Sequence, residues 1–225
     1  MRAIRDLLRR RHRLVRIRAE GYTHIHLICH QEGFADITSQ AVKDKATRRE
    51  LISIFSDFSL KKTIAADLDI IDMLDPYIKQ LETEIRNQAK EHNHRDYALL
   101  QTMPGIGEMT ALIILYETHD IKRFPTVQKY SSYCRVVPCE RDSNGKSKKG
   151  KHQKMGNPYL KWAYSQILHN ARRYSERINR NYQRLESKHG PARARSIMEH
   201  KFAVTVYSML KHHQAFDEKR FFKIN

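Results

Sequence analysis

The feature that most constrains the fold is an apolar stripe within residues 64–91. Leucine and isoleucine recur there at steps of three or four residues, at Leu68, Ile71, Leu74, Ile78, Leu81 and Ile85. Such a stripe is typical of the seam of a coiled coil, and it must pack against another helix of this chain or against a second copy. Asp75 and Pro76 interrupt the stripe as a cap and a first-turn proline would, so we expect a kink or a new helix start there.

Other segments also favour a mostly α fold. Residues 2–18 predict a basic amphipathic helix. Asn157 and Pro158 are typical of an N-cap followed by a first-turn proline, and the helix they open is expected to end at "HGP", residues 189–191. A last helix is predicted over roughly residues 192–213. The chain has only 8 Gly and 6 Pro, which argues against a β-sandwich and for long helices. The apolar positions of these last two helices are Leu160, Ala163, Ile167, Leu168, Ala171, Ile197, Phe202, Val206 and Leu210.

A glycine turn lies between two apolar segments at "MPGIG", residues 103–107. The pattern resembles a helix-hairpin-helix, in which glycine allows positive φ and exposes N–H groups to a phosphate near the start of the second helix. Gly105, Ile106 and Gly107 are therefore candidate nucleic-acid-binding residues. The acidic Glu108 weakens that interpretation, and a tight helix connection without a ligand is the alternative.

The charge is strongly positive and unevenly distributed. The net charge is +17, and residues 127–225 carry 22 basic against seven acidic side chains. Residues 1–18 add eight arginines and one aspartate. Such asymmetry indicates a polyanionic partner. Nucleic acid is favoured over a membrane surface, because the basic region lacks an apolar face rich in Trp and Phe and no apolar run approaches a membrane span. The expected compartment is the cytoplasm.

A basic, glycine-containing loop is predicted between Arg141 and Lys154. Its cations could contact a phosphate backbone. A solvated surface loop is the alternative. The candidate nucleic-acid-binding residues of this region are Arg141, Lys146, Lys148, Lys149, Lys151, Lys154 and Asn157.

The sequence predicts no metal site. The cluster "HIHLICH", with His24, His26, Cys29 and His30, has no standard ligand spacing. The three cysteines form neither a disulfide framework nor a zinc ribbon. Asp67, Asp69 and Asp72 fall on the predicted long helix, where a solvated helix face is the expected role.

Four stretches together resemble one known family. "LLQTMPGIGEMTALIIL", "RFPTVQKYSSYCRVVP", "DSNGKSKKGKHQKMGNPYLKWA" and "FAVTVYSMLK" resemble, in order and spacing, the C-terminal transposase domain of the one-ten insertion-sequence family. The resemblance covers roughly residues 95–217. It implies three segments: linker and coiled-coil helices over 1–95, the C-terminal transposase domain over 96–217, and a tail over 218–225.

The resemblance also implies a reaction. These transposases join an N-terminal RuvC-like domain, with a DEDD acidic set, to this C-terminal domain, and they use a serine nucleophile and a guide RNA. The matching serine is Ser143, with Ser147 as the alternative. No strand-borne acidic quartet is recognisable here, so we expect a C-terminal portion of a longer transposase. Accordingly, no cofactor is expected in this chain, and divalent magnesium only with the DEDD domain.

Three functions remain open at this level. The leading one is the nucleic-acid-binding, serine-bearing half of a transposase, with DNA and guide RNA as partners and with self-association through residues 64–91 or with full-length copies. A non-catalytic DNA- or RNA-binding helical module is the second. A helical scaffold that oligomerises is the third.

Overall fold

The protein was analysed as a computed structural model, which describes residues 2–89, 94–137, 140–143, 146–149 and 155–223, the two short strands by their backbone. The fold is mostly α, as predicted. The chain divides into two compact units, Asp6–Gln88 and Met1–Arg5 with Ala89–Asn225, and each is described by itself.

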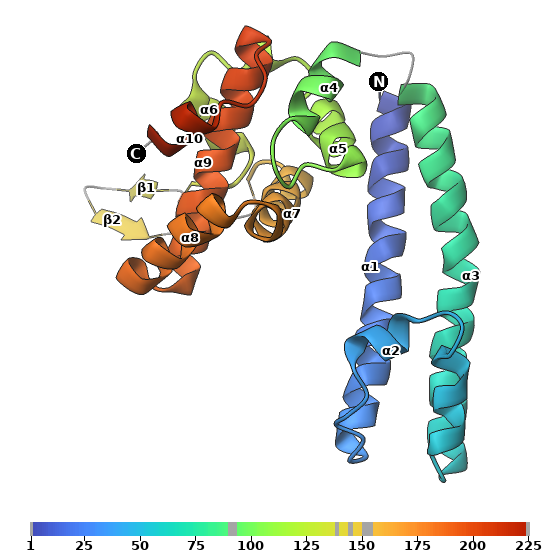
Figure 1. The fold of residues 1–225 in the computed structure, drawn as a ribbon. Coiled ribbons are helices and arrows are strands. Elements are labelled where there is room, and N and C mark those ends of the chain that lie inside the picture. Colours follow the sequence, from blue (N-terminus) through green and yellow to red (C-terminus); the bar gives the residue numbers. More distant parts are fainter. Residues whose placement is uncertain (1, 90–93, 138–139, 144–145, 150–154, 224–225) are drawn as a thin grey trace. The chain divides into compact units, whose positions relative to one another are not determined.

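The first unit is built on two long antiparallel helices (Figure 1). These are α1 (Arg2–Gln31) and α3 (Phe58–Ala89), and between them the chain forms α2 (Ser39–Lys43) and the 3₁₀ helix η1 (Arg48–Ile54). The basic helix predicted over 2–18 therefore exists and runs thirteen residues further.

The apolar stripe of α3 packs against α1 of the same chain. Leu14 of α1 lies in one cluster with Leu74 and Ile78. Toward the other end of the pair, Ile25 and Ile28 share a cluster with residues of α3 that include Ile64 and Leu68. Self-association through residues 64–91 stays a prediction, and because this seam is already occupied, a second copy would meet the outer face of α3, where Ile70, Met73 and Tyr77 are about half exposed.

The expected restart at Pro76 is wrong. Helix α3 continues through Pro76 from Phe58 to Ala89. Asp75 does not act as a cap, because its carboxylate accepts hydrogen bonds from Arg18 at 2.7 Å and from Arg48 at 3.2 Å. A proline removes one backbone hydrogen bond from a helix, and here the buried seam on both sides of Pro76 keeps the helix together.

Arg48 is the central cation of the first unit. It is 1% exposed, and its guanidinium donates to Asp72, to Asp75 and to the Tyr22 hydroxyl. Burial alone raises the pKa of Asp72, but hydrogen bonds from Arg48 and Arg49 outweigh it and leave that pKa below its ordinary value. Asp69 also pairs with Arg49. Asp69, Asp72 and Asp75 of α3 are thus ion-paired to this chain's own cations rather than merely solvated.

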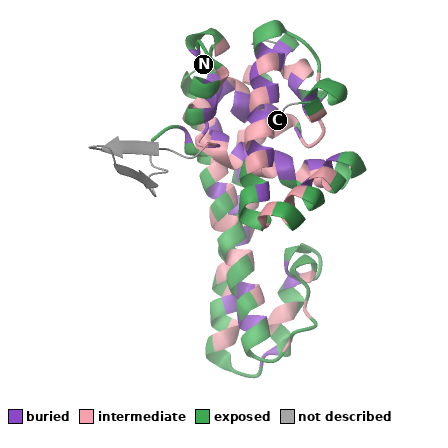
Figure 2. Ribbon diagram, turned by 90° about the vertical axis from the view of Figure 1, so that its left-hand side faces the viewer, coloured by how far each residue is buried: buried purple, intermediate pink, exposed green. Residues whose placement is uncertain are grey.

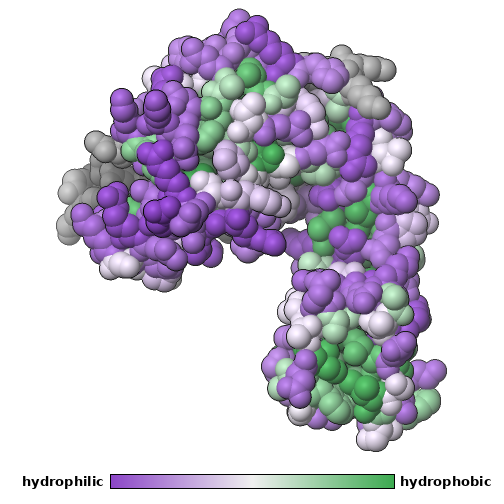
Figure 3. Space-filling view, in the orientation of Figure 1, coloured by the Kyte–Doolittle hydropathy of each residue, from purple (hydrophilic) through white to green (hydrophobic). Residues whose placement is uncertain are grey.

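The end of this unit that carries α2 has a mixed surface. Phe34, Ile37, Leu51, Ile52 and Leu60 pack, only partly buried, around the core cluster of α1, α2 and α3. Figure 3 shows the apolar area they belong to, surrounded by hydrophilic side chains.

The second unit is a helical domain with one β-hairpin. Its elements are α4 (His94–Gln101), α5 (Glu108–Thr118), η2 (Ile121–Arg123), α6 (Val127–Tyr133), β1 (Glu140–Ser143), β2 (Lys146–Lys149), α7 (Pro158–Tyr174), α8 (Glu176–His189), α9 (Pro191–His212) and α10 (Glu218–Lys223).

Three sequence expectations change in this unit. The helix opened by Asn157 does not reach His189, because Ser175 ends α7 and caps α8. The segment 218–225 is not simply a tail, since it contains α10, whose Phe221 is fully buried. The basic segment 141–154 is not only a loop, because β1 and β2 pair antiparallel within it.

The core of the second unit is formed mainly by α7 and α9. The predicted apolar face of α7 is buried at all five positions, and Phe202, Val206 and Leu210 of α9 are buried as well. Figure 2 shows buried positions on the helices of this domain. Within the described residues, no helix is long and apolar enough to cross a membrane.

The Arg48 cluster yields a stability prediction. Arg48→Ala should lower the free energy of unfolding of the first unit by about 3 kcal/mol, because it removes a buried cation from two carboxylates. Arg49→Ala is the matched control, since Arg49 is half exposed, and it should cost less than about 1 kcal/mol. Urea unfolding measures both, and equal losses would contradict this assignment. The contribution of Asp72, whose pKa is depressed, is present above about pH 4 and should be lost on further acidification.

Candidate nucleic-acid interface

The hairpin leaves the helical domain and returns to it at neighbouring points. On the outgoing side, the Val136 N–H donates to the Ser131 carbonyl at the end of α6. On the returning side, the Asn157 N–H donates to the Tyr133 carbonyl at 2.6 Å. The Arg135 Nε donates across to the Met155 carbonyl at 3.0 Å. These bonds fix both ends of the segment that carries the candidate serines.

A buried polar cluster lies beneath this attachment point. Asn157 is 4% exposed, and its amide nitrogen donates to the Glu117 carboxylate at 2.6 Å and to the Tyr133 hydroxyl at 3.2 Å. Its side-chain oxygen accepts from the N–H groups of Tyr159 and Leu160, which caps α7 as predicted. The structure therefore gives Asn157 a positioning role, since its amide is fully engaged by the protein itself.

Backbone conformation also shapes the attachment point. Gly156 has φ +95°, and a Cβ there would lie 2.6 Å from the Tyr133 carbonyl. Arg135 has φ +59°, a left-handed value that is uncommon outside glycine. A residue with a side chain at 156 would collide with the end of α6, so only glycine permits this close approach.

The register of the hairpin divides its residues between two faces. The pairs across the ladder are Glu140 with Lys149, Arg141 with Lys148, Asp142 with Ser147, and Ser143 with Lys146. Alternate residues of a strand belong to opposite faces, and residues paired across a ladder share a face. One face thus contains Ser143 with Arg141, Lys146 and Lys148, and the other contains Ser147 with Glu140, Asp142 and Lys149.

The glycine turn joins α4 to α5 and packs on α7. Gly105 has φ +91°, and a Cβ at this position would lie 2.5 Å from the Ile167 carbonyl and 2.7 Å from the Ala171 nitrogen. Ile106 is 6% exposed. Gly105 and Ile106 therefore face the protein, and Gly105 is required for close helix packing.

Gly107 plays a different part. Its φ is −87°, so positive φ is not the reason for this glycine, contrary to the sequence interpretation. It is the N-cap of α5 and makes no side-chain cap bond, and a Cβ there would meet nothing within 4 Å. The first turn of α5 begins beside this open position, with Glu108 as its first residue.

The two candidate elements are both held by α7 but at different places along it. The hairpin returns at Asn157, whereas Gly105 packs at Ile167 and Ala171. Ten residues of helix separate the first contact from the second, which corresponds to about 15 Å. The predicted binding residues thus belong to two surfaces rather than to one compact pocket. Lys151 and Lys154 lie outside the described residues.

Burial excludes three other nucleophilic groups near the attachment point. Cys134 is buried, and desolvation raises the pKa of its thiol far above the ordinary value. Tyr130 and Tyr164 are fully buried and hydrogen-bonded to each other at 2.8 Å, and burial likewise raises their pKa values. Because a thiolate or phenolate is the attacking form, these three groups are poor nucleophiles.

The predicted absence of a metal site remains untested. His24 pairs with Asp67 at 2.6 Å, the His26 and His30 rings pack edge to face, and Cys29 is buried. Among the described residues, no group of three or more His, Cys, Asp or Glu side chains is arranged to hold a metal ion.

Sequence reasoning missed Glu117 and Tyr133 as positioning residues. Glu117 is 2% exposed and lies in the apolar run "ALIILYET" of α5. A carboxylate inside such a run is a signal, because a buried charge needs a dedicated hydrogen-bond partner. The identity of that partner, forty residues away in sequence, was not accessible from spacing.

Comparison with known proteins identifies the class of this domain. Residues 97–183, which run from α4 into α8 and include the glycine turn and the hairpin, match a transposase family model. The family is described as Transposase IS116/IS110/IS902 family, and the match over residues 97–183 confirms the resemblance seen in the sequence. The match supports a function in transposition. No match to the chain is found among curated protein sequences.

The two glycines of the turn yield a paired prediction. Gly105→Ser should lower the free energy of unfolding by at least about 2 kcal/mol, because the new side chain is strained at positive φ and collides with the α7 backbone. Gly107→Ser should change it by less than about 0.5 kcal/mol, because serine is a good N-cap and the space is open. Urea unfolding followed by circular dichroism measures both, and equal effects would refute this division of roles.

Gly107→Ser also tests the predicted phosphate binding by the turn. A serine hydroxyl at this N-cap would occupy the N–H groups of α5 that a phosphate would use. DNA affinity measured by fluorescence anisotropy should fall if the turn binds phosphate. An unchanged affinity in the folded variant would favour a purely structural turn.

Proposed function

We propose that the second unit binds DNA through the cationic face of the β1–β2 hairpin and that Ser143 is the nucleophile of strand transfer. The observation that carries the proposal is the register, in which Ser143 pairs with Lys146 and shares its face with Arg141 and Lys148. Three cations and no acid accompany Ser143 on that face. A scissile phosphate beside Ser143 would therefore be neutralised as charge develops on its oxygens.

The same register disfavours Ser147. Ser147 pairs with Asp142 and shares its face with Glu140 and Lys149. Two acids against one cation would repel an approaching phosphate. Ser147 remains the alternative that experiment must exclude, because the two serines are only four residues apart.

The proposed reaction exchanges one phosphoester for another. The Ser143 oxygen attacks phosphorus, a serine phosphoester forms, and the bond between phosphorus and one sugar oxygen breaks. The serine proton leaves, and the released sugar oxygen takes up a proton. Because one phosphoester replaces another, the energy of the broken bond is kept for rejoining. A fixed attachment point matters for this step, because misplacing a nucleophile by about 1 Å can cost roughly a hundredfold in rate.

The resemblance implies magnesium held by a DEDD set, but the described acids do not fit that role. Asp72 and Asp75 are bound by arginines, and Glu117 is bound by Asn157. A serine hydroxyl is a weak nucleophile without an activating base or metal. We therefore assign activation to carboxylates beyond the described residues, with a guide RNA directing the target, and the proposed place of action is the nucleoid.

The two faces of the hairpin provide a matched binding test. Lys148→Gln should weaken duplex DNA binding about threefold and reduce the salt slope by about one, because it removes one phosphate contact. Lys149→Gln removes the same charge from the opposite face and should leave the duplex affinity and the salt slope nearly unchanged. Fluorescence anisotropy over a salt series measures the two variants. Equal losses would mean that only the total charge matters.

Ser143 is tested by trapping its covalent product. The chain is combined with a related DEDD-bearing transposase whose own serine is replaced, with guide RNA, Mg²⁺ and labelled DNA. Wild type should give a protein–DNA adduct on a denaturing gel, Ser143→Ala should give none, and Ser147→Ala should behave as wild type. An adduct that survives Ser143→Ala but not Ser147→Ala would reverse the assignment. Binding without any adduct would favour a non-catalytic module.

A further inference from the structure

A cavity of about 340 Å³ lies between α8, α9 and α10, outside the surfaces considered above. Its lining comes from Asn181, Arg184 and Leu185 of α8, Ile197, His200 and Lys201 of α9, and Phe222 of α10. The volume falls within the range of small-ligand pockets. All three helices are continuous, so the walls are preformed.

The cavity carries positive charge that no acid neutralises. Arg184 and Lys201 both line it, and no described carboxylate pairs with either. Burial, and then the charge of Arg184, lower the pKa of Lys201, as expected for two cations that face one another. Two like charges that line one cavity favour an anionic ligand.

Every acid on the surrounding helices is engaged elsewhere. On α8, Glu176 pairs with Arg180, and Glu186 accepts a hydrogen bond from the Tyr182 hydroxyl. Glu199 of α9 pairs with Lys161, and Glu218 of α10 pairs with Arg177. No carboxylate of these three helices therefore compensates the positive charge of the cavity.

The cavity also contains uncharged groups that could bind the non-anionic part of a larger ligand. The Asn181 side-chain oxygen is buried and has no hydrogen-bond partner within the described structure. An orphaned buried acceptor costs about 1–3 kcal/mol unless a ligand donor satisfies it. The Phe222 ring adds an aromatic wall. The Arg177 guanidinium carbon lies 4.3 Å from the centroid of this ring. Burial lowers the pKa of His200 and so favours its neutral ring, which can also donate a hydrogen bond.

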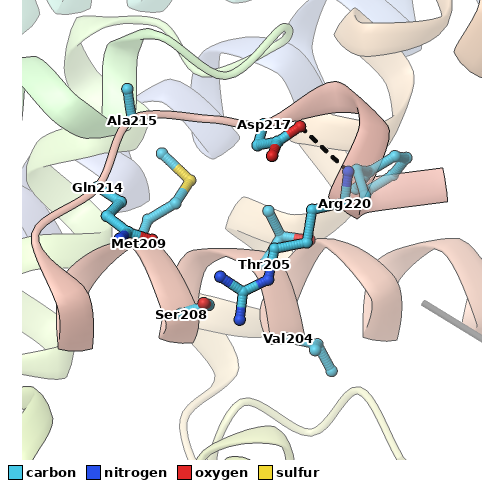
Figure 4. Close-up of a pocket in the computed structure, with 9 residues that line it drawn as sticks. Val204, Thr205, Ser208, Met209, Gln214, Ala215, Asp217 and Arg220 are labelled. Atoms are coloured by element: carbon cyan, nitrogen blue, oxygen red, sulfur yellow. Dashed lines mark hydrogen bonds between the residues drawn. The ribbon is translucent and has the colours of Figure 1, made fainter. Parts of the chain in front are cut away.

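A second cavity nearby lacks these properties. It measures about 140 Å³ and lies between the end of α9 and the loop that enters α10 (Figure 4). Its lining includes Asp217 as well as Arg220, and Asp217 accepts a hydrogen bond from the Arg220 backbone N–H. The two opposite charges can offset one another, and the volume is less than half that of the first cavity.

We propose that the α8–α9–α10 cavity binds one unpaired nucleotide, with Arg184 and Lys201 on its phosphate, Phe222 against its base and Asn181 accepting a hydrogen bond from a base N–H. The ligand class follows from the combination of cations, an aromatic wall and an unsatisfied acceptor, which a nucleotide matches group by group. The site is separate from the hairpin and does not depend on Ser143. The bound nucleotide is either an unpaired residue of a nucleic-acid strand or a free nucleotide.

The test compares single-stranded and duplex binding by the full chain. The probe is a fluorescein-labelled twelve-residue oligo(dA), with a duplex of equal length beside it. Lys201→Gln and Arg184→Gln should each weaken single-strand binding about tenfold and leave duplex binding within about twofold. Lys188→Gln, an exposed lysine on α8, is the matched control and should leave both unchanged. Arg184 is exposed, so its variant should retain the fold, which circular dichroism verifies.

Two competitors identify the source. Displacement of the oligomer by AMP but not by inorganic phosphate would assign the cavity to nucleotides in general, whereas failure of AMP to compete would assign it to positions within a strand. The same oligomer with abasic central positions should bind about tenfold more weakly. Equal binding of the abasic oligomer, or equal losses in Lys188→Gln and Lys201→Gln, would overturn the proposal. Because the hairpin variants act on duplex binding, failure here leaves that proposal standing.

Discussion

The buried hydrogen bond between Asn157 and Glu117 is the interaction on which the candidate interface depends. The amide nitrogen of Asn157 donates it, so that it joins α5 to the start of α7 across forty residues of sequence, and the oxygen of the same amide caps α7. A charge-assisted bond shielded from water is strong, and losing one partner would leave a buried charge less well satisfied. The ends of the basic hairpin are therefore held by the core of the domain, whatever conformation the strands adopt.

Helix α7 organises the rest of the second unit. Its N-terminus holds the hairpin, its middle receives the glycine turn through Gly105, and Lys161 pairs with the buried Glu199 of α9. A helix that contacts so many elements transmits its position to all of them, because packed interiors deform little. The glycine turn and the hairpin are consequently both positioned by α7.

The two units use charge in opposite ways. In the first unit, Asp69, Asp72 and Asp75 are paired with arginines, so positive and negative groups stabilise each other within the chain. In the second unit, the hairpin face of Ser143 and the α8–α9–α10 cavity both carry cations without acids. Since uncompensated positive charge costs stability, its retention there is consistent with an external anionic partner.

The sequence by itself determined the helical class, the buried seam of α3, the Asn157 cap and the transposase resemblance, because these depend on local periodicity and short motifs. It also contained an overlooked signal, since Asn144 and Gly145 form a dipeptide typical of two-residue hairpin turns. Only the tertiary structure decided that α1 covers the seam, that Gly105 serves helix packing, that Glu117 holds Asn157, and that Ser143 and Ser147 belong to opposite faces. Each of these depends on residues distant in sequence or on strand register, and a shift of one residue in register reverses every face.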